Sequence, residues 1–455
     1  MSERFDLAVI GSGPGGYVAA IRGAQLGLRT VVVERDALGG RCLNYACIPA
    51  KAVLRAADAV DAIRGAARFG VHADNPRVEF TGVRAWRDDV VSTLTGGVRG
   101  LLRKNGIEVR HGHGRLTGNG GLLVDDHQLT ARAIVLATGS VATTVAGIEF
   151  GRRVIGTEQA WALDELPGRI AVLGAGASGV EIASAYARLS SEVLLIEATD
   201  RILPAEDADI SALVDRKLRD QGITIHTAAT VAEPSQDNHS VSFTVDSHTE
   251  RVDWLVVAAG RGPDTEGLDL AAGQVELDEH RLIAVDAHLR TTAEGVWAIG
   301  DLVRGPALAH KASEEGILAV EDAAGRSPEP LNHRLIPRAT FGAPPVASVG
   351  LTEAQARDQG YDVRVGTARY GSVGAGTVLG DRDGLVKLVG EARYGELLGA
   401  HIVGAKATEL IQELVATQAL EGGLPELATT IHGHPTLSEA IQEAARDAQG
   451  WMVHR

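Results

Sequence analysis

The chain has 455 residues, of which 45% are hydrophobic and 23% are charged, and its net charge is −15 from 44 basic and 59 acidic residues. This length exceeds what one hydrophobic core supports, so we expect about three domains. The negative charge argues against nucleic acid and anionic membranes as partners, and no run of about 18 apolar residues predicts a membrane span. The first residues show no secretory signal pattern, so we expect a soluble, cytoplasmic protein.

Residues 5–34 predict an apolar strand, a glycine turn, an alanine-rich helix and a second strand that ends in an acid, and residues 169–197 repeat this pattern. Each acid, Glu34 or Glu197, follows its first glycine by 23 positions (34 − 11 and 197 − 174). The glycines of the two turns are Gly11, Gly13, Gly16, Gly174, Gly176 and Gly179.

A GxGxxG pattern in this context typically binds the pyrophosphate of a dinucleotide at the helix N-terminus, while the acid binds ribose hydroxyls. The alternative is a pair of glycine turns that serve only the fold. The second acid also favours NAD over NADP, because a carboxylate at Glu197 repels a 2′-phosphate.

The only two cysteines, Cys42 and Cys47, lie in GGRCLNYACIPAK (39–51), directly after the first acid. In a reducing compartment an isolated pair is more often redox-active or metal-binding than a structural staple. A disulfide across this spacing requires a bent segment or a helix start, where the helix dipole would stabilise a thiolate. Zinc is the alternative, although two cysteines offer too few ligands.

The segment HGHPTLSE (432–439) offers His434 and Glu439 as an acid–base pair. Pro435 favours an extended conformation at His434, immediately before a predicted helix. Thr436 and Glu439 also have the spacing of a capping box, so the glutamate either caps the helix or orients the imidazole as a base. We expect His432 to be structural.

Other breaks in the pattern divide the chain. IVLATGS (134–140) and WLVVAAGRGPDT (254–265) predict strands that end in turns, and residues 335–349 are rich in proline and glycine. We therefore place domain boundaries near residues 143, 262 and 335.

These motifs, with LTGGVRGLLRKNGIEV (94–109) and VWAIGDLVRGPALAHKASEEG (296–316), resemble the pyridine nucleotide-disulfide oxidoreductases, and among them the dihydrolipoamide dehydrogenases. The resemblance implies an α/β fold with two Rossmann-like dinucleotide-binding domains and an α+β C-terminal dimerisation domain. The implied domains are an FAD-binding domain at 1–142 with a second, central part at 263–335, an NAD-binding domain at 143–262, and a dimerisation domain at 336–455.

The resemblance also implies residue roles. Cys42 corresponds to the thiol that exchanges with substrate, Cys47 to the thiol against the flavin, and His434 to the base that Glu439 orients. Lys51 matches a lysine that pairs with a glutamate beside the flavin, here Glu181, the alternative being two ordinary helix-surface charges. The other implied FAD contacts are Asp301, Gly114, Thr138, Gly139, Ser140, Ala309 and His310, and Gly260 is assigned to the NAD region.

The implied activity is the oxidation of protein-bound dihydrolipoyl groups to lipoyl, with reduction of NAD⁺ through FAD. In this family the His–Glu pair reaches the disulfide of the other subunit, which implies a homodimer. The implied partners are lipoyl domains of a 2-oxo acid dehydrogenase complex or the glycine cleavage H-protein.

Two alternatives are an NAD(P)H-dependent reductase of the glutathione or mycothione type and a redox-silent nucleotide-binding or structural subunit. Glu197 argues against NADPH, and the intact set of thiols and acid–base residues argues against a silent subunit. Arg41, Ala46 and Ala50 depart from the family pattern. Of these, Arg41 is hypothesised to lower the pKa of Cys42, because a guanidinium stabilises a neighbouring thiolate.

Overall fold

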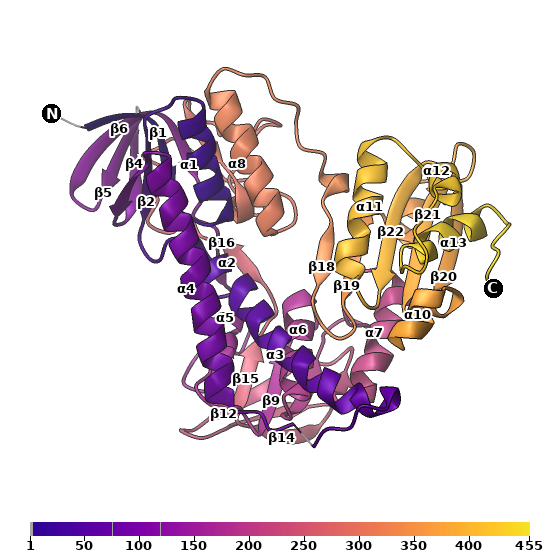
Figure 1. Ribbon diagram of the computed structural model, residues 1–455. Helices are drawn as coiled ribbons and strands as arrows, with labels where there is room; N and C mark the ends of the chain where they lie inside the picture. The colour runs from indigo at the N-terminus through magenta and orange to yellow at the C-terminus, as the bar shows by residue number, and fades with distance from the viewer. Residues whose placement is uncertain (1–2, 75, 119) are drawn as a thin grey trace. The chain divides into compact units, whose positions relative to one another are not determined.

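A computed structural model describes residues 3–74, 76–118 and 120–455 (Figure 1). The chain separates into two compact units. The first contains Met1–Val53, Thr81–Thr143 and Gly260–Leu331, and the second contains Leu54–Phe80, Thr144–Ala259 and Asn332–Arg455. Within the described ranges, no helix combines the length and the apolar character that crossing a membrane would require.

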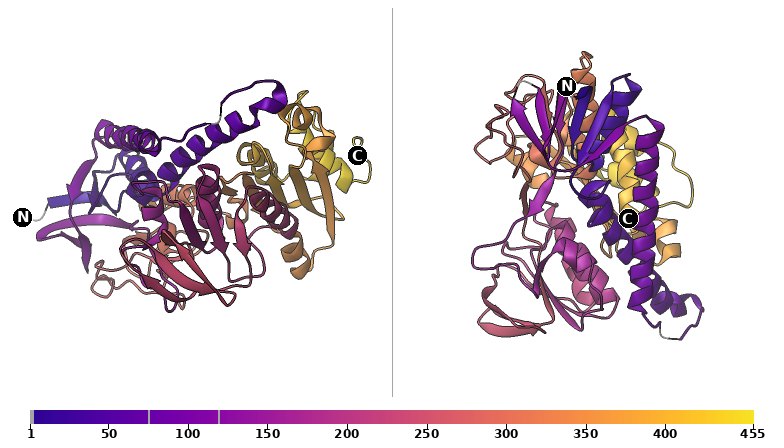
Figure 2. Two further views of the ribbon diagram at one scale, coloured as in Figure 1. Left: turned by 90° about the horizontal axis from the view of Figure 1, so that it is seen from below. Right: turned by 90° about the vertical axis from the view of Figure 1, so that its left-hand side faces the viewer.

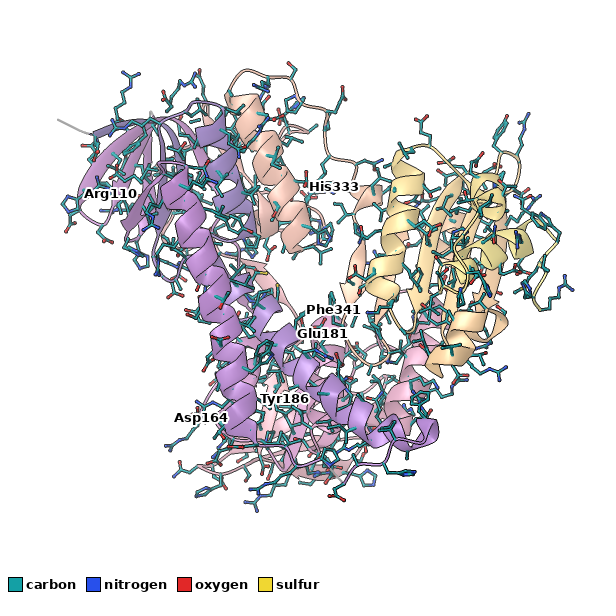
Figure 3. All side chains as sticks on the ribbon, in the orientation of Figure 1. Arg110, Asp164, Glu181, Tyr186, His333 and Phe341 are labelled. Atoms are coloured by element: carbon teal, nitrogen blue, oxygen red, sulfur yellow. The ribbon has the colours of Figure 1, made fainter. Side chains whose placement is uncertain are left out.

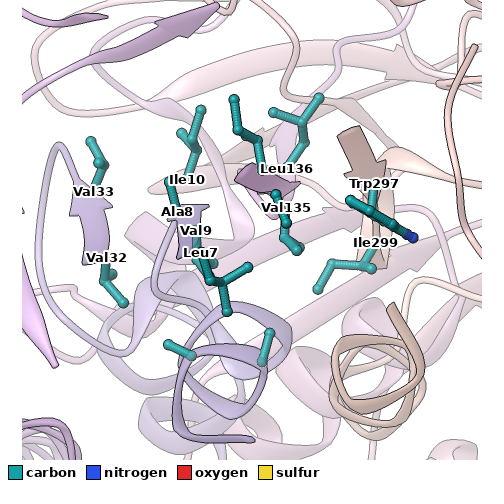
Figure 4. Packing of buried hydrophobic residues seen from close by; sticks show 14 of the residues in the cluster. Leu7, Ala8, Val9, Ile10, Val32, Val33, Val135, Leu136, Trp297 and Ile299 are labelled. Carbon is teal, nitrogen blue, oxygen red and sulfur yellow. The ribbon is translucent and has the colours of Figure 1, made fainter. Parts of the chain in front are cut away.

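The first unit is built on a seven-stranded sheet whose strand order is β3-β2-β1-β6-β5-β4, with β17 beside β6. Its buried strands run parallel and are rich in valine, isoleucine and leucine, as expected where both faces are covered. Their side chains form a single apolar core (Figure 4). The strands are β1 (Glu3–Ile10), β2 (Thr30–Glu34), β3 (Glu108–His111), β4 (Gly114–Gly118), β5 (Gly121–Val124), β6 (His127–Leu136) and β17 (Val296–Ala298).

Two helices of the first unit, α1 (Pro14–Gln25) and α8 (Ala309–Ala323), lie side by side (Figure 1). They approach closely because glycines face each other: a Cβ on Gly316 would lie 2.5 Å from the carbonyl oxygen of Gly15. Helix α2 (Gly40–Asn44) also belongs to the first unit, as do the start of α3 (Cys47–Gly65), up to Val53, and α4 (Phe80–Lys104) from Thr81 onward.

The second unit contains a five-stranded parallel sheet of order β11-β10-β9-β15-β8 and a separate antiparallel sheet of order β12-β13-β14. Helix α6 (Ala177–Arg188) follows β9, and α7 (Ala208–Asp220) follows β10. The strands are β8 (Val154–Gly156), β9 (Arg169–Leu173), β10 (Glu192–Ile196), β11 (Thr224–His226), β12 (Ala232–Gln236), β13 (Val241–Val245), β14 (His248–Val252) and β15 (Trp254–Val257).

The C-terminal part of the second unit is an antiparallel sheet of order β18-β19-β22-β21-β20. Helices α11, α12 and α13 contribute buried apolar side chains that form one cluster with those of one face of the sheet (Figures 1 and 2). The elements are β18 (Arg338–Thr340), β19 (Val346–Gly350), α9 (Glu353–Asp358), β20 (Val363–Arg369), β21 (Leu385–Glu391), β22 (Leu397–Val403), α11 (Ala407–Ala419), α12 (Leu424–Thr429) and α13 (Glu439–Ala448).

The fold class predicted from the sequence is confirmed. Both repeats, residues 5–34 and 169–197, form a strand, a turn, a helix and a second strand in parallel register. The C-terminal region combines helices with an antiparallel sheet, as the α+β prediction required.

Candidate active site

The first glycine of each repeat has a backbone conformation that only glycine adopts readily. The φ angles of Gly11 and Gly174 are 100° and 101°. A Cβ on Gly11 would lie 2.4 Å from the Ala137 carbonyl oxygen, and one on Gly174 would lie 2.7 Å from that of Ala258. The third glycines, Gly16 and Gly179, are enclosed in the same way, since a Cβ would lie 2.0 Å and 1.8 Å from the carbonyl oxygen of the first glycine.

The second glycines face open space instead. A Cβ on Gly13 or on Gly176 would meet no atom within 4 Å, although both residues immediately precede a 12-residue helix. The first N–H groups of such a helix have no partner within the helix, and they carry the positive end of its dipole. Both turns therefore fit the pyrophosphate of a dinucleotide, whose close approach a side chain at this position would obstruct.

The two acids hold the glycine turns in place. The Oε2 atom of Glu34 accepts hydrogen bonds from the backbone N of Ser12 at 2.8 Å and from its hydroxyl at 2.6 Å. In the second repeat, Oε2 of Glu197 accepts one from the backbone N of Ala175 at 2.7 Å, and Oε1 binds Thr199. Both carboxylates are buried at the carboxyl end of the second strand, where the predicted ribose contact lies.

The cysteine segment begins on the first glycine turn. The backbone N of Gly39 donates to the hydroxyl of Ser12 at 3.2 Å, and a Cβ on Gly40 would lie 2.6 Å from the Cα of Gly13. Cys42 follows on α2, and Cys47 is the first residue of the 19-residue helix α3, so the helix start that the spacing allowed is present. The structure therefore places the thiols directly after the backbone that lines the nucleotide cradle.

Both cysteines are present as half-buried thiols. A hydrogen bond with Cys47, followed by burial, raises the pKa of Cys42 above its ordinary range, and the charges of Lys51 and Arg41 oppose this shift. Arg41 therefore acts in the hypothesised direction, but in the dithiol the net shift is upward.

A polar cluster lies at the end of β6 in the first unit. Ser140 donates from its hydroxyl to Oδ2 of Asp301 at 2.5 Å and accepts from Nε of Arg261 at 2.8 Å. The hydroxyl of Thr138 donates to the backbone carbonyl of Asp264 at 2.6 Å. Two of the predicted FAD contacts, Ser140 and Asp301, thus touch although they are 161 residues apart, and a third, Thr138, lies two residues before Ser140.

A buried ion pair of α8, Lys311 and Glu315, holds the backbone of the residue that precedes Asp301. Nζ of Lys311 donates to the carbonyl of Gly300 at 2.9 Å, and Oε2 of Glu315 accepts from the N–H of Gly300 at 2.7 Å. The two side chains, at most 1% exposed, are 3.0 Å apart. Burial raises the pKa of Glu315 despite the neighbouring Lys311. Both polar groups of the Gly300 backbone, next to Asp301, are therefore held.

Other predicted contacts of the first unit have simpler surroundings. Gly114 begins β4, where a Cβ would lie 2.9 Å from a methyl group of Ile10, so packing alone requires glycine there. Gly139 and Gly260 both have positive φ angles, 80° and 144°. Ala309 and His310 are the first two residues of α8, as the sequence predicted.

Lys51 and Glu181 belong to different units. Lys51 lies on α3, and Glu181 is buried on α6, where its Oε1 accepts a hydrogen bond from the backbone N of Phe341 at 2.9 Å (Figure 3). The alternative of an ordinary surface charge is therefore wrong for Glu181. Its pairing with Lys51 stays a prediction.

The predicted acid–base pair is formed in the second unit. Nδ1 of His434 is 2.9 Å from Oε1 of Glu439, and the imidazole is 74% exposed. Burial opposes ionisation of Glu439, but a hydrogen bond from the backbone N of Thr436 and the charges of His434 and His432 lower its pKa. Because an ionised carboxylate only accepts a hydrogen bond, Nδ1 of His434 donates to Glu439, which leaves the lone pair of Nε2 to accept a proton. Nε2 makes no hydrogen bond to the described part of the chain.

The predicted capping box is only half present. Oε2 of Glu439 accepts from the backbone N of Thr436 at 2.8 Å, but the hydroxyl of Thr436 donates to the carbonyl of Gly433 and does not cap the helix. Helix α13 begins at Glu439 itself. Glu439 therefore serves both uses that the sequence left open, one with each oxygen. The His434–Pro435 peptide is cis, which the sequence did not predict.

Two dinucleotide folds in one chain, with a dithiol directly after the first cradle, define a class of oxidoreductase that couples thiol chemistry to nucleotide cofactors. Comparison with known proteins agrees. The chain belongs to the pyridine nucleotide-disulphide oxidoreductases, which its residues 5–316 match, and residues 336–445 match the dimerisation domain of that family. The resemblance and the enzyme class expected from the sequence are therefore confirmed.

Individual relatives match nearly end to end. A dihydrolipoyl dehydrogenase from Thermus scotoductus is 43% identical, over 99% of both chains, and one from Zymomonas mobilis is 41% identical over the full length of both. Among solved structures, LpdA from Mycobacterium tuberculosis has a TM-score of 0.90 at 25% identity and covers 98% of this chain and 99% of its own. The flavoprotein disulfide reductase RclA from Escherichia coli has a TM-score of 0.87 at 27% identity, covering 97% and 99%.

Several side chains near these sites were missed from the sequence. Arg261 falls in the predicted turn GRGPDT but begins a short strand, β16 (Arg261–Pro263), and its partner Ser140 is 121 residues away. Lys311 and Glu315 have the i,i+4 spacing of an ion pair on one helix. Such a pair usually lies on a solvated helix face, whereas this one is buried and binds the Gly300 backbone. Only the fold brings these groups to the predicted residues.

Proposed function

We propose that this chain is a dihydrolipoyl dehydrogenase, which oxidises protein-bound dihydrolipoyl groups to lipoyl and delivers the two electrons to NAD⁺ by way of FAD. The observation that supports this most directly is the close approach of Gly40 to Gly13, because Cys42 follows Gly40 by two residues and Gly13 belongs to the proposed pyrophosphate site. The relatives at about 40% identity bear this name. When bound, FAD accepts an electron pair and NAD⁺ a hydride, which is chemistry that the side chains lack.

In the proposed exchange, a dihydrolipoyl thiolate attacks the Cys42 sulfur of a Cys42–Cys47 disulfide, and the second dihydrolipoyl sulfur then displaces Cys42. The products are a lipoyl disulfide and the Cys42/Cys47 dithiol, so two electrons and two protons leave the substrate. His434 takes the proton of the attacking thiol at Nε2, and Glu439 stabilises the imidazolium that results. The exposed ring and its basic Nε2 suit this role.

We assign FAD to the domain formed by residues 1–142 and 263–335, NAD to residues 143–262, and dimerisation to residues 336–455. The match to a dimerisation domain supports a homodimer, in which His434 would serve the disulfide of the other subunit. Lys51 would pair with Glu181 beside the flavin. The proposed partners are lipoyl domains of a 2-oxo acid dehydrogenase complex or the glycine cleavage H-protein, in the cytoplasm.

The test is NAD⁺ reduction by dihydrolipoamide with the purified, FAD-loaded protein. We expect Cys42→Ser and Cys47→Ser each to lower the rate by about three orders of magnitude, since members of one catalytic unit fail together. Reduction of ferricyanide by NADH should persist in both variants, because it draws electrons without thiol exchange. If the protein instead reduced glutathione disulfide or mycothiol disulfide with NADPH, and did not reduce NAD⁺ with dihydrolipoamide, it would be a reductase of the glutathione or mycothione type.

A further inference from the structure

A second histidine–glutamate pair lies two residues before His434. Nε2 of His432 is 2.7 Å from Oε1 of Glu413 on α11, and its Nδ1 is 3.1 Å from the backbone carbonyl oxygen of Thr430. Unlike His434, the His432 side chain is only 6% exposed. Both of its ring nitrogens are therefore engaged in a nearly closed site.

The partners of His432 determine its protonation. A backbone carbonyl can only accept a hydrogen bond, and so can an ionised carboxylate. Nδ1 must then donate to Thr430 and Nε2 must donate to Glu413, and a ring that donates from both nitrogens is an imidazolium. Only a protonated His432 can therefore satisfy both partners at once.

The same contacts connect His432 to the helix that carries Glu439. The carbonyl of Thr430 also accepts a hydrogen bond from Nε2 of Gln442, at 2.5 Å. Gln442 lies three residues after Glu439 on α13, and side chains at this spacing are neighbours on one helix face. The charge of His432 contributes to the lowered pKa of Glu439, after the larger effects of burial and of the Thr436 hydrogen bond.

We infer that His432 is a positioning residue for the His434–Glu439 pair: anchored to Glu413 and Thr430, it places a cationic side chain near the Glu439 carboxylate and holds the start of α13. This inference rests on the proposed function, because it assumes that His434 is the base. It replaces the expectation that His432 serves the fold alone.

Among the described residues, the titratable groups shown to interact with His432 are Glu413 on α11 and Glu439 on α13, and His434 is hydrogen-bonded in turn to Glu439. A neutral side chain at position 432 removes a positive charge from among them. Protonation of Glu439 then begins at a higher pH, and the protonated form of His434 loses a like charge nearby. Both effects move the acidic limb of the kcat/KM profile toward higher pH.

The test compares His432→Gln and His432→Asn with wild type in the dihydrolipoamide–NAD⁺ reaction between pH 5 and pH 9. We expect the acidic limb to move up by about half a unit to one unit. The rate at pH 6 then falls by about 3-fold to 10-fold, with a smaller loss at pH 8. His226→Gln is the matched control, since His226 pairs with Asp246 at 2.7 Å elsewhere in the same unit, and its profile should equal that of wild type.

Either variant alone is sufficient, so a fold defect in one leaves the other. A uniform loss of rate with an unmoved limb would show a merely structural role, and an unchanged profile would show none; both overturn the inference. Failure of the proposed function looks different, because wild type itself would then not reduce NAD⁺ with dihydrolipoamide, whatever the state of His432.

Discussion

At the scale of single residues, Glu34 and Glu197 make equivalent hydrogen bonds in the two repeats. Each carboxylate accepts a backbone N–H from the residue after the first glycine and another from the loop beyond its own strand, Asp36 N at 2.9 Å and Thr199 N at 2.9 Å. The acid thus fixes the distance between the turn that would bind pyrophosphate and the loop that would face ribose. The same carboxylate would therefore both bind ribose and hold the loop that faces it.

Replacing each acid by glutamine should therefore impair one cofactor only. We expect Glu34→Gln to release FAD more readily and Glu197→Gln to raise KM for NAD⁺ by about 10-fold to 100-fold. The reason is that a lost charged hydrogen bond in a buried site costs about 1.5–3 kcal/mol. FAD retention is measured by flavin absorbance after gel filtration, and KM by initial rates.

Glu192→Gln is a suitable control, because Glu192 begins the strand that Glu197 follows but its side chain is 60% exposed. It should change neither cofactor. Loss of FAD from the Glu197 variant, with normal FAD in the Glu34 variant, would reverse our assignment of the two cradles.

The glycines and acids of the two repeats were predictable because the sequence pattern that reveals them lies within one short segment. Gly11 and Glu34 lie within one strand–turn–helix–strand unit, whose spacing the backbone geometry dictates. The partner of His432 was not predictable in the same way. Glu413 lies 19 residues earlier, on α11, whereas His432 lies in a loop, and nothing in the sequence distinguishes Glu413 from the solvated acids around it.

At the scale of elements, two charged side chains of α8 bind the backbone of Gly300, the residue that precedes Asp301. The charges of Lys311 and Glu315 are fully buried, and each binds the Gly300 backbone. The two are not equivalent, because burial has already raised the pKa of Glu315. A carboxyl group in this position can take up a proton when its partner is lost, which limits the cost of leaving Glu315 without Lys311.

We therefore expect Glu315→Gln to be the more damaging change. It strands the Lys311 charge, and breaking a buried pair in this way costs about 3–5 kcal/mol. Lys311→Met should cost less, and the double variant should be more stable than Glu315→Gln alone, since neither charge then remains buried. Urea unfolding of the three variants measures this order; a Lys311→Met protein less stable than the Glu315→Gln protein would contradict it.

Element boundaries were less predictable than element types. The Thr436–Glu439 spacing predicted a helix capped by Thr436, yet α13 begins at Glu439 and the threonine hydroxyl turns to Gly433. A local rule could not choose between the cap and the imidazole for Glu439, because each of its oxygens serves one of them.

At the scale of the whole molecule, the second unit joins two distant parts of the chain through buried charge. Lys387 on β21 is 4% exposed and binds Asp207 at 2.9 Å, Asp209 at 2.6 Å and Glu353 at 2.8 Å. Asp207 caps α7, which belongs to the second nucleotide-binding fold, whereas Lys387 belongs to the C-terminal sheet. Despite burial, hydrogen bonds with the three carboxylates raise the pKa of Lys387.

No sequence pattern predicted this cluster, because Lys387 and Asp207 are 180 residues apart. Its neighbours on the same face of the sheet are also polar: His401, opposite Lys387, and Ser348, opposite His401, are both buried. Alternation along the strands predicts one buried face and one solvated face for such a sheet. The polar face is buried here because α7 and its acids cover it.

The pH dependence of stability follows from the acids of this cluster. Hydrogen bonds with Lys387 lower the pKa of Glu353 and, against burial, that of Asp207. Carboxyl groups with a lowered folded-state pKa stabilise the protein above about pH 4 and lose that contribution as the pH falls further. We expect the thermal midpoint of wild type to fall steeply below pH 4, and that of Lys387→Met to start lower and fall less. Equal slopes for the two proteins would contradict this.

The same cluster predicts that the second nucleotide-binding fold and the C-terminal sheet unfold together. Lys387→Met leaves Asp207 buried without its cation, which costs about 3–5 kcal/mol. Lys217→Met removes an exposed pair with Asp383 that also links α7 to the C-terminal region, and such pairs are worth at most about 1 kcal/mol. In native-state hydrogen exchange, peptides from residues 144–259 and from 332–455 should lose protection equally in the Lys387 variant and hardly at all in the Lys217 variant. Loss confined to one region would mean that the two parts open independently, and that Lys387 stabilises a local contact without coupling them.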